Sequence, residues 1–317
     1  MILVTGGTGF IGRALIRHLV EMGQPVRMLV RPSPQSPNLP RGVAVEVALC
    51  SLTDERGLRA ALKGVDVVYH LASAEGAGSR GDLFGVDIQG TRSVSAAAAE
   101  AGVKRLFMLS HLGADRASAY PVLKAKAIAE TYVRQSGVDY TIFRSGLVFG
   151  PRDRFTTQMA ALLHALPLIA LMPGDGKTLI QPLWVEDLVT CLTWALDDPG
   201  SCNQVYSIGG PEYLSIQDVM AAIAHACGTR RLMIPIGPAY LRGMTVWFEH
   251  RYPKFPLSIF WLDYLAADRT CGQDAIPRLF GFIPAQFSQR LGHLQGEPWR
   301  RILFGKLRQR QLKVKHG

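Results

Sequence analysis

The glycine-rich segment near the start of the chain constrains the fold more than any other feature. An apolar run at residues 2–5 leads into the loop GGTGFIG at residues 6–12, and a helix is expected at residues 13–22. Unpaired N–H groups at the start of a helix attract phosphate. Gly6 allows the tight turn, Gly9 lets the backbone approach a pyrophosphate, and Gly12 allows close contact between helix and strand. The segment therefore predicts a dinucleotide-binding site.

Strand-like and helix-like segments alternate through the first half of the chain. Strands are expected at residues 2–5, 26–30, 43–48, 67–71, 106–110 and 140–144, and helices at 13–22, 54–62, 90–101 and 122–135. Such alternation predicts an α/β fold, a Rossmann-type doubly wound parallel sheet with helices on both faces. Ligands of these sheets bind beyond the carboxyl ends of the strands. The glycine loop, residues 71–73, Ser110 and Arg144 all fall at those ends.

The rhythm becomes irregular after Gly150, where prolines interrupt the segments. We therefore predict an NAD(P)-binding core at residues 1–155. Residues 156–290 are expected to form interleaved segments that complete the sheet and a smaller C-terminal lobe on the substrate side. Residues 291–317 are expected to form a basic amphipathic tail.

Composition and charge narrow the functional class. Of the 35 Lys and Arg residues, 12 lie in residues 251–317, together with only 4 of the 25 Asp and Glu residues. The positive charge is thus concentrated at the C-terminal end, which argues against nucleic-acid binding and for an anionic partner near that end. No apolar run is long enough to span a bilayer and no secretory signal precedes the first strand, so a cytoplasmic protein is expected. The five widely spaced cysteines predict reduced thiols, and no metal site is expected.

The end of the second strand indicates which dinucleotide binds. An acidic residue there bonds the ribose 2′-hydroxyl of NAD, whereas an arginine accommodates the 2′-phosphate of NADP. The predicted strand ends at Val30 and is followed by Arg31, and Arg13 could add a second positive charge. NADP(H) is therefore favoured, while a solvated loop role for Arg31 leaves NAD(H) open.

Several motifs together resemble the short-chain dehydrogenase/reductase superfamily in its extended and atypical branch, the group labelled NAD-dependent epimerase/dehydratase proteins. Within it, the chain is similar to the dehydrogenase-like accessory subunits of respiratory complex I and their bacterial relatives. The likeness runs from residue 1 to about residue 225. The motifs are GGTGFIG at 6–12, DVVYHLA at 66–72, GTR at 90–92, GVKR at 102–105, SHLGA at 110–114, FRSGLVFGPRDRF at 143–155, QPLWVEDL at 181–188 and GGP at 209–211.

The resemblance implies a catalytic tyrosine, lysine and serine. In the superfamily the lysine lowers the tyrosine pKa and binds the nicotinamide ribose, the tyrosine exchanges a proton with the substrate, and the serine orients it. The tyrosine and lysine need i,i+4 spacing on a helix, which Tyr120 and Lys124 provide, with Ser110 at the end of the preceding strand.

The register of that lysine is ambiguous. The family's lysine is usually followed four residues later by a glutamate, and Lys126 with Glu130 fits that spacing better than Lys124 does. Tyr120 would then lie about 240° around the helix from Lys126, and the pair would not form. Pro121 also suits the first turn of a helix, which would place Tyr120 at its edge.

The resemblance also implies contacts to the dinucleotide. Ser51 occupies the position of an aspartate that contacts adenine in relatives, and Asp87 replaces the usual asparagine before Gly-Thr. A single histidine at a strand end, such as His70 or His111, is expected to be packed or cofactor-facing rather than catalytic. Asp187 is expected to cap a helix at residues 188–196. The predicted cofactor-binding residues are Gly6, Thr8, Gly9, Phe10, Ile11, Gly12, Arg13, Arg31, Ser51, Leu71, Ala72, Ser110 and Lys124.

The C-terminal end suggests a surface role. Residues 232–265 are rich in aromatic side chains interleaved with basic ones, which suits a protein partner, a lipid headgroup surface or a lobe core. Trp299, Leu303 and Leu307 recur at helical spacing among basic residues, so a basic amphipathic helix on anionic lipid or an acidic subunit is expected. A solvated tail is the alternative.

Two functions remain open on this basis. The first is an NAD(P)(H)-binding peripheral subunit or assembly factor of a membrane energy-conversion complex, on the cytoplasmic membrane face, with the nucleotide in a structural or sensing role. The second is an active NADP-dependent oxidoreductase, epimerase or dehydratase acting on a sugar-nucleotide, steroid-like or isoprenoid substrate. The irregular spacing of Tyr120 from the lysines and the basic tail favour the first.

Overall fold

A seven-stranded parallel sheet forms the centre of the molecule. The computed structural model describes all residues except 34–38, 40–41, 252–257 and 309–317, and it gives the backbone alone for residues 304–308. The strand order is β11-β6-β5-β4-β1-β2-β3, and every neighbouring pair is parallel. The strands are β1 (Ile2–Thr5), β2 (Val26–Val30), β3 (Glu46–Leu49), β4 (Val67–His70), β5 (Arg105–His111), β6 (Tyr140–Ser145) and β11 (Gln204–Ile208).

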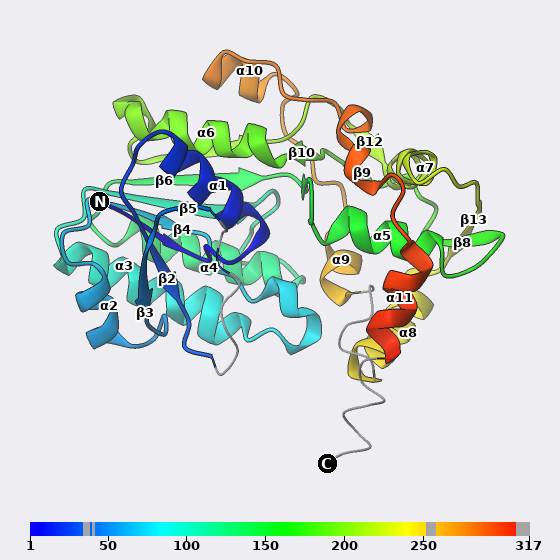
Figure 1. Cartoon of the computed structure of the whole chain (residues 1–317), viewed down its shortest axis with the longest axis horizontal. Helices are drawn as coiled ribbons and strands as arrows, with labels where there is room; N and C mark the ends of the chain where they lie inside the picture. The colour runs from blue at the N-terminus through cyan, green and yellow to red at the C-terminus, as the bar shows by residue number, and fades with distance from the viewer. Residues whose placement is uncertain (34–38, 40–41, 252–257, 309–317) are drawn as a thin grey trace.

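Helices cover both faces of this sheet (Figure 1). On one face, α1 (Phe10–Glu21) and α6 (Val185–Asp197) pack over an apolar core that includes Leu15, Tyr69 and Leu188. On the other face, the sheet packs against α2 (Glu55–Ala61), α3 (Gly90–Glu100) and α4 (Pro121–Arg134). The short helical segments η1 (Glu75–Arg80), η2 (Phe84–Gln89) and η3 (Pro199–Ser201) complete this part. The predicted doubly wound sheet is thus confirmed.

A smaller lobe follows and lies to one side of the sheet (Figure 1). Its own apolar core joins α5, α7, α9 and α11. Its helices are α5 (Phe155–Leu163), α7 (Ile216–Ala226), α8 (Pro238–Arg251), α9 (Ile259–Tyr264) and α11 (Trp299–Arg308), with η4 (Ser288–Arg290) and η5 (Gly292–Leu294), while α10 (Ala275–Phe280) packs near α6. The short strand pairs are β7 (Val148–Phe149) with β10 (Leu183–Trp184), β8 (Ile169–Pro173) with β13 (Leu232–Ile236), and β9 (Leu179–Ile180) with β12 (Leu214–Ser215).

The first helix starts earlier than the sequence indicates. α1 begins at Phe10 rather than at residue 13, because Gly9 has an extended backbone and serves as its N-cap. The amide of Arg13 donates to the carbonyl of Gly9 at 3.1 Å, which closes the first helical turn inside the glycine loop. The end of the loop and the start of the helix are therefore the same residues.

The C-terminal tail is helical over the residues of α11. Trp299 and Leu303 are buried in the core of the lobe, and α11 packs on α5. Arg300 and Arg301 are exposed between them. The apolar side of this basic helix is thus covered by the protein itself at these two positions, while the side chain of Leu307 and residues 309–317 lie outside the described residues. Among the described helices, none combines the length and apolar character needed to cross a membrane.

Candidate functional site

The glycine loop has the backbone geometry that a dinucleotide requires. Gly6 has a φ of 71°, and a Cβ there would lie 2.7 Å from backbone atoms of Leu71 and Ala72. A Cβ on Gly12 would meet the carbonyl oxygen of Gly6. No side chain caps the amides at the start of α1. Donors without a capping partner at a helix N-terminus bind phosphate, so these residues fit a dinucleotide pyrophosphate.

Positive charge gathers beside this loop. Arg13 lies in the first turn of α1, and burial together with the neighbouring charges of Arg152 and Arg17 lowers its pKa. Arg152 has a φ of 70°, a backbone conformation unusual for a residue with a side chain. Arg31 is exposed directly after β2. Because neighbouring positive charges repel one another, the binding of an anion close to them is favourable.

Three polar side chains joined by hydrogen bonds link the ends of the neighbouring strands β1 and β4. Thr5 Oγ1 lies 2.8 Å from His70 Nδ1, and His70 Nε2 lies 2.9 Å from Thr91 Oγ1. The three side chains are buried, and burial followed by the charge of Lys126 lowers the His70 pKa to about 4. His70 is therefore neutral and packed, in agreement with the expectation from its strand-end position.

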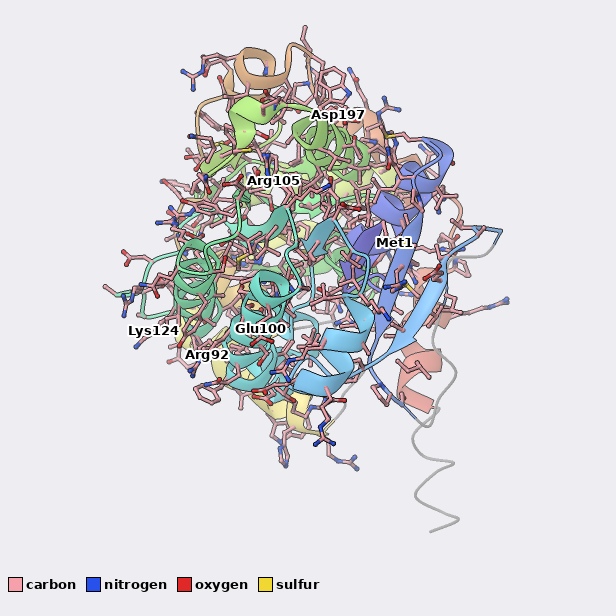
Figure 2. All side chains as sticks on the ribbon, turned by 90° about the vertical axis from the view of Figure 1, so that its left-hand side faces the viewer. Met1, Arg92, Glu100, Arg105, Lys124 and Asp197 are labelled. Carbon is pink, nitrogen blue, oxygen red and sulfur yellow. The ribbon has the colours of Figure 1, made fainter. Side chains whose placement is uncertain are left out.

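The structure distinguishes between the two lysines of α4. Lys126 is buried and its Nζ lies 3.1 Å from Asp87 Oδ1, whereas Lys124 is exposed on the outer side of the helix (Figure 2). Burial lowers the Lys126 pKa, but the charges of Asp87 and Glu75 outweigh it and the net shift is upward. Lys126 thus keeps its charge at the edge of the sheet, next to Asp87 on η2.

The position one helical turn before Lys126 carries no acid or base. That position is Val122, and Tyr120 precedes it as the N-cap residue with an extended backbone. Because side chains share a helix face at i,i+4, Lys126 and Tyr120 do not form the tyrosine–lysine pair of the superfamily. The structure brings Tyr120 instead against Arg269, whose guanidinium carbon lies 5.6 Å from the tyrosine ring centre.

Ser110 is engaged within the protein. Its hydroxyl is fully buried and donates to Glu130 Oε1 at 2.7 Å. Glu130 also accepts from Arg144 at 2.9 and 2.6 Å and from Arg134 at 2.9 Å. The carboxylate therefore ties β5 and β6 to α4, and Ser110 belongs to this structural network.

His111, the residue after Ser110, forms a second charged pair. His111 Nε2 lies 2.7 Å from Glu75 Oε2. Burial raises the Glu75 pKa, but the charge and hydrogen bond of His111, together with the charge of Lys126 and a hydrogen bond from Ser73, outweigh it and bring the value to about 2. Since an ionised carboxylate only accepts, Nε2 carries the proton, and His111 Nδ1 is a buried atom with no partner among the described residues.

The lobe closes over this histidine. The rings of Phe260 and Tyr264 from α9 lie 5.8 and 5.9 Å from the His111 ring. Tyr264 is 2% exposed and its hydroxyl has no hydrogen-bond partner among the described residues. Burial raises the Tyr264 pKa, so the hydroxyl keeps its proton. Two residues with an unpartnered polar atom, His111 and Tyr264, are thus neighbours at the boundary between sheet and lobe.

Three of the remaining predicted residues follow the ends of strands. Ser51, Leu71 and Ala72 are half-buried after β3 and β4, on the side of the glycine loop. Asp187 does not cap a helix, because α6 begins at Val185 with Trp184 as its N-cap. Asp187 lies in the first turn and accepts from the amide of Ala285 at 2.7 Å, which attaches the C-terminal segment.

Three residues of the site carry no motif in the sequence. Glu75 lies in a short helical segment, Asp87 stands where the resemblance implies an asparagine, and Tyr264 is one of many aromatic residues of the lobe. The asparagine-to-aspartate difference was the one signal available, because an acid at that point needs a buried cation, and Lys126 supplies it. Glu75 and Tyr264 become visible only when the loop and the lobe pack against His111.

Comparison with known proteins agrees with this geometry. A family profile described as NAD(P)H-binding matches residues 6–159. The NAD(P)H azoreductase of Xenophilus azovorans is 31% identical over 230 residues, 72% of this chain and 74% of that protein. The mouse mitochondrial protein NADH dehydrogenase [ubiquinone] 1 alpha subcomplex subunit 9 is 31% identical over 214 residues, but the match spans 66% of this chain and only 56% of that subunit.

The fold is also found among solved structures. An NADPH-dependent quinone oxidoreductase from Escherichia coli, solved with NADPH, superposes with a TM-score of 0.73 over 93% of this chain and 99% of that one, at 22% identity. At that identity the likeness concerns the fold alone.

Proposed function

Because this chain belongs to the extended short-chain dehydrogenase/reductase superfamily, we propose that it is an NAD(P)H-dependent reductase in which His111 delivers the proton. The bound dinucleotide would supply the hydride. The residues that fit it are the glycine loop at its pyrophosphate and Lys126 at its nicotinamide ribose. The observation that carries the proposal is the Glu75–His111 pair, whose Nδ1 has no partner among the described residues and whose ring lies 5.9 Å from the ring of Tyr264.

Lys126 is suited to hold a neutral sugar rather than to transfer a proton. Its pKa is shifted upward and Asp87 orients its ammonium group, so it remains a fixed donor at neutral pH. Val122 occupies the position from which a tyrosine would act with it. A proton donor must therefore come from another element.

His111 can fill that role from the end of β5. The carboxylate of Glu75 accepts from Nε2–H and fixes the orientation of the ring, which leaves Nδ1 as the atom that donates to a substrate oxygen. This is the same division of labour as in a catalytic triad, where an acid fixes the orientation of the imidazole. The Tyr264 hydroxyl, kept protonated by burial, supplies a second donor to the same oxygen.

The test uses His111→Gln in the full chain, with His225→Gln as the control because His225 is exposed on α7. Oxidation of NADPH is followed with a panel of quinone, aldehyde and ketone acceptors. With the best acceptor, His111→Gln should lower kcat by about 10²–10⁴-fold while leaving NADPH affinity within twofold, as general acid catalysis predicts. Glu75→Gln should shift the alkaline limb of the pH–rate profile to lower pH, because the general acid loses its negative neighbour. Full activity in His111→Gln, or no acceptor in the panel for the wild type, would exclude the proposal.

We favour NADP(H) over NAD(H) as the cofactor. Arg31 follows β2 without an acidic residue beside it, which suits a 2′-phosphate. Arg31→Ala should therefore weaken NADPH binding at least tenfold and leave NADH binding unchanged, as measured by the fluorescence of the reduced cofactor. Equal losses for both would refute the preference.

A second function, a subunit of a membrane energy-conversion complex with a non-reacting nucleotide, is supported by Val122, an apolar residue four positions before Lys126, where a tyrosine would pair with that lysine. The match to the mouse complex I subunit supports this function in part, because it covers 56% of that subunit. It predicts retained NADPH that no acceptor oxidises, and binding to salt-washed membranes that Arg300→Glu with Arg301→Glu abolishes. This pair tests exposed charge without removing the buried Trp299.

A further inference from the structure

Arg269 is a buried cation without an anionic partner. Its side chain is 8% exposed, and no carboxylate of the described residues lies within ion-pair distance of it. Among the described residues, the guanidinium donates one hydrogen bond, from Nη1 to the carbonyl of Asp268 at 3.3 Å. Nε and Nη2 are both buried and have no acceptor among the described residues. A buried guanidinium in this state is costly unless something supplies an acceptor.

The two free atoms form one binding edge. Nε and Nη2 lie side by side on the guanidinium plane, and their parallel N–H bonds match the two oxygens of a carboxylate or phosphate. Lysine could not offer the same fork, because its ammonium group is a single point charge. The unpaired edge of Arg269 is therefore the edge that recognises an oxyanion.

Several elements hold the guanidinium in place. The amide of Arg269 donates to the carbonyl of Leu179 at 2.8 Å, and Asp268 is occupied by accepting from the amide of Leu179, also at 2.8 Å. The guanidinium carbon lies 5.6 Å from the Tyr120 ring centre and 5.9 Å from the Tyr264 ring centre. A Cβ on Gly113 would lie 3.0 Å from Nη1, so the group also approaches the loop that follows β5. The contacts of the guanidinium with the two aromatic rings are favourable cation–π interactions, and they leave the N–H groups of its Nε–Nη2 edge free to donate hydrogen bonds.

This position lies on the substrate side and not on the pyrophosphate side of the site. The ring centre of Tyr264 lies 5.9 Å from the guanidinium carbon of Arg269 and 5.9 Å from the ring centre of His111. The glycine loop and Arg13, which suit the cofactor phosphates, belong to the start of α1. Arg269 and the proposed proton donor are thus both neighbours of Tyr264.

We propose that Arg269 binds an oxyanion, a carboxylate or phosphate, that the substrate carries close to the carbonyl group to be reduced. This proposal rests on the proposed function in one respect, namely that the bound anion belongs to the substrate of the reductase. Oxyanion binding itself requires no turnover. The substrate class is then a carbonyl compound with a nearby acidic group, and the aromatic rings of Tyr120 and Tyr264 flank its anion.

The experiment measures binding to the full chain saturated with NADP⁺, using hexanoate, hexyl phosphate and 1-hexanol as probes in calorimetry. The wild type should bind at least one anionic probe tenfold or more tightly than 1-hexanol. Arg269→Met should remove that preference, Arg269→Lys should retain a part of it, and Arg278→Met, which removes an exposed arginine of α10, should leave it unchanged. NADPH affinity should be the same in all four proteins.

Thermal unfolding provides the second readout. Each bound anion should raise the midpoint of the wild type and not that of Arg269→Met, whose ligand-free midpoint should equal or exceed the wild-type value because an unpaired buried charge is gone. If Arg269→Met does not fold, Arg269→Lys and the probe comparison in the wild type still decide.

Equal binding of hexanoate, hexyl phosphate and 1-hexanol would overturn the proposal. So would an anion preference that survives in Arg269→Met, or one that appears only without dinucleotide, since the anion would then occupy the cofactor's phosphate site. Anion binding through Arg269 in a protein that reduces no acceptor would refute the reductase alone. Reduction of a carbonyl compound with a nearby acidic group that is indifferent to Arg269 would refute the anion site alone.

Discussion

Two buried polar clusters at the carboxyl edge of the main sheet differ in how completely they are paired. In the first, Thr5, His70 and Thr91 satisfy one another at 2.8 and 2.9 Å within the dinucleotide-binding half. In the second, where the lobe meets the sheet, His111 Nδ1, the Tyr264 hydroxyl and two nitrogens of Arg269 have no partner among the described residues. Buried polar groups are normally hydrogen-bonded, so the first cluster stabilises the fold and the second is arranged for a ligand.

The difference has a physical cause in how each cluster is assembled. The first joins the ends of β1 and β4 to α3, elements that are fixed by sheet pairing and helix packing. The second is built from a loop, a strand end and the lobe, with the charged partner of His111 coming from Glu75 on η1. A substitution that removes one member of a hydrogen-bonded pair should lower the stability of the fold, whereas removal of a group without a partner should not.

The largest effect is expected from the buried ion pair at the border of the two clusters. Lys126→Met leaves Asp87 as an uncompensated buried charge and should lower the free energy of unfolding by about 3–5 kcal/mol. Lys124→Met, on the exposed side of the same helix, should change it by less than about 0.5 kcal/mol. Chemical denaturation measures both. Equal effects would show that the two lysines are not distinguished by burial, and the double change Lys126→Met with Asp87→Asn should recover part of the loss.

The next effect concerns acid. Burial followed by the charge of Lys126 lowers the His70 pKa from 6.5 to about 4 in the folded protein. Between those values the unfolded chain binds the additional proton, so the stability from His70 is complete above pH 6.5 and is lost as the pH falls to 4, by about 3 kcal/mol. Denaturation curves of His70→Gln should show a flatter pH dependence over this interval than those of the wild type or of His225→Gln. If the pH dependence of stability in His70→Gln equals that of the wild type, other groups cause the loss of stability in acid.

The smallest effect distinguishes the clusters most directly. Thr5→Val keeps the shape of the side chain but leaves His70 Nδ1 without its partner, and should cost about 1–3 kcal/mol of stability. Tyr264→Phe removes a hydroxyl that has no partner and should change stability by less than about 0.5 kcal/mol, while it lowers reductase activity. Thermal unfolding of the two variants checks the contrast. A large loss in Tyr264→Phe would mean that its hydroxyl is structural.

Much of the dinucleotide-binding half could be read from the residues alone. Alternating apolar segments gave each strand of the sheet through β6 within about three residues of its position, because burial on both faces of a parallel sheet selects continuous apolar runs. The glycine loop was equally visible, since Gly6 and Gly12 are required by backbone contacts inside a short segment. The start of α1 was misplaced, because Gly9 is the helix cap and is also part of the loop.

The site beyond the loop could be predicted only in part. The sequence offered Lys124 and Lys126 with equal chemistry, and burial against Asp87 distinguishes them. It offered Ser110 as an orienting hydroxyl, which in the structure donates to Glu130. The basic helix at the C-terminal end was visible in the pattern, but the burial of Trp299 and Leu303 in the lobe was not.

The sequence by itself determined the parallel sheet, the dinucleotide loop and the family to which the chain belongs. These depend on interactions between residues that are close in the chain or repeat at regular spacing. Only the tertiary structure decided that Glu75 pairs with His111, that Tyr264 covers the pair, and that Arg269 lies beside them with a free edge. Those contacts join segments far apart in the chain, and they depend on how the lobe packs against the sheet, which no local pattern records.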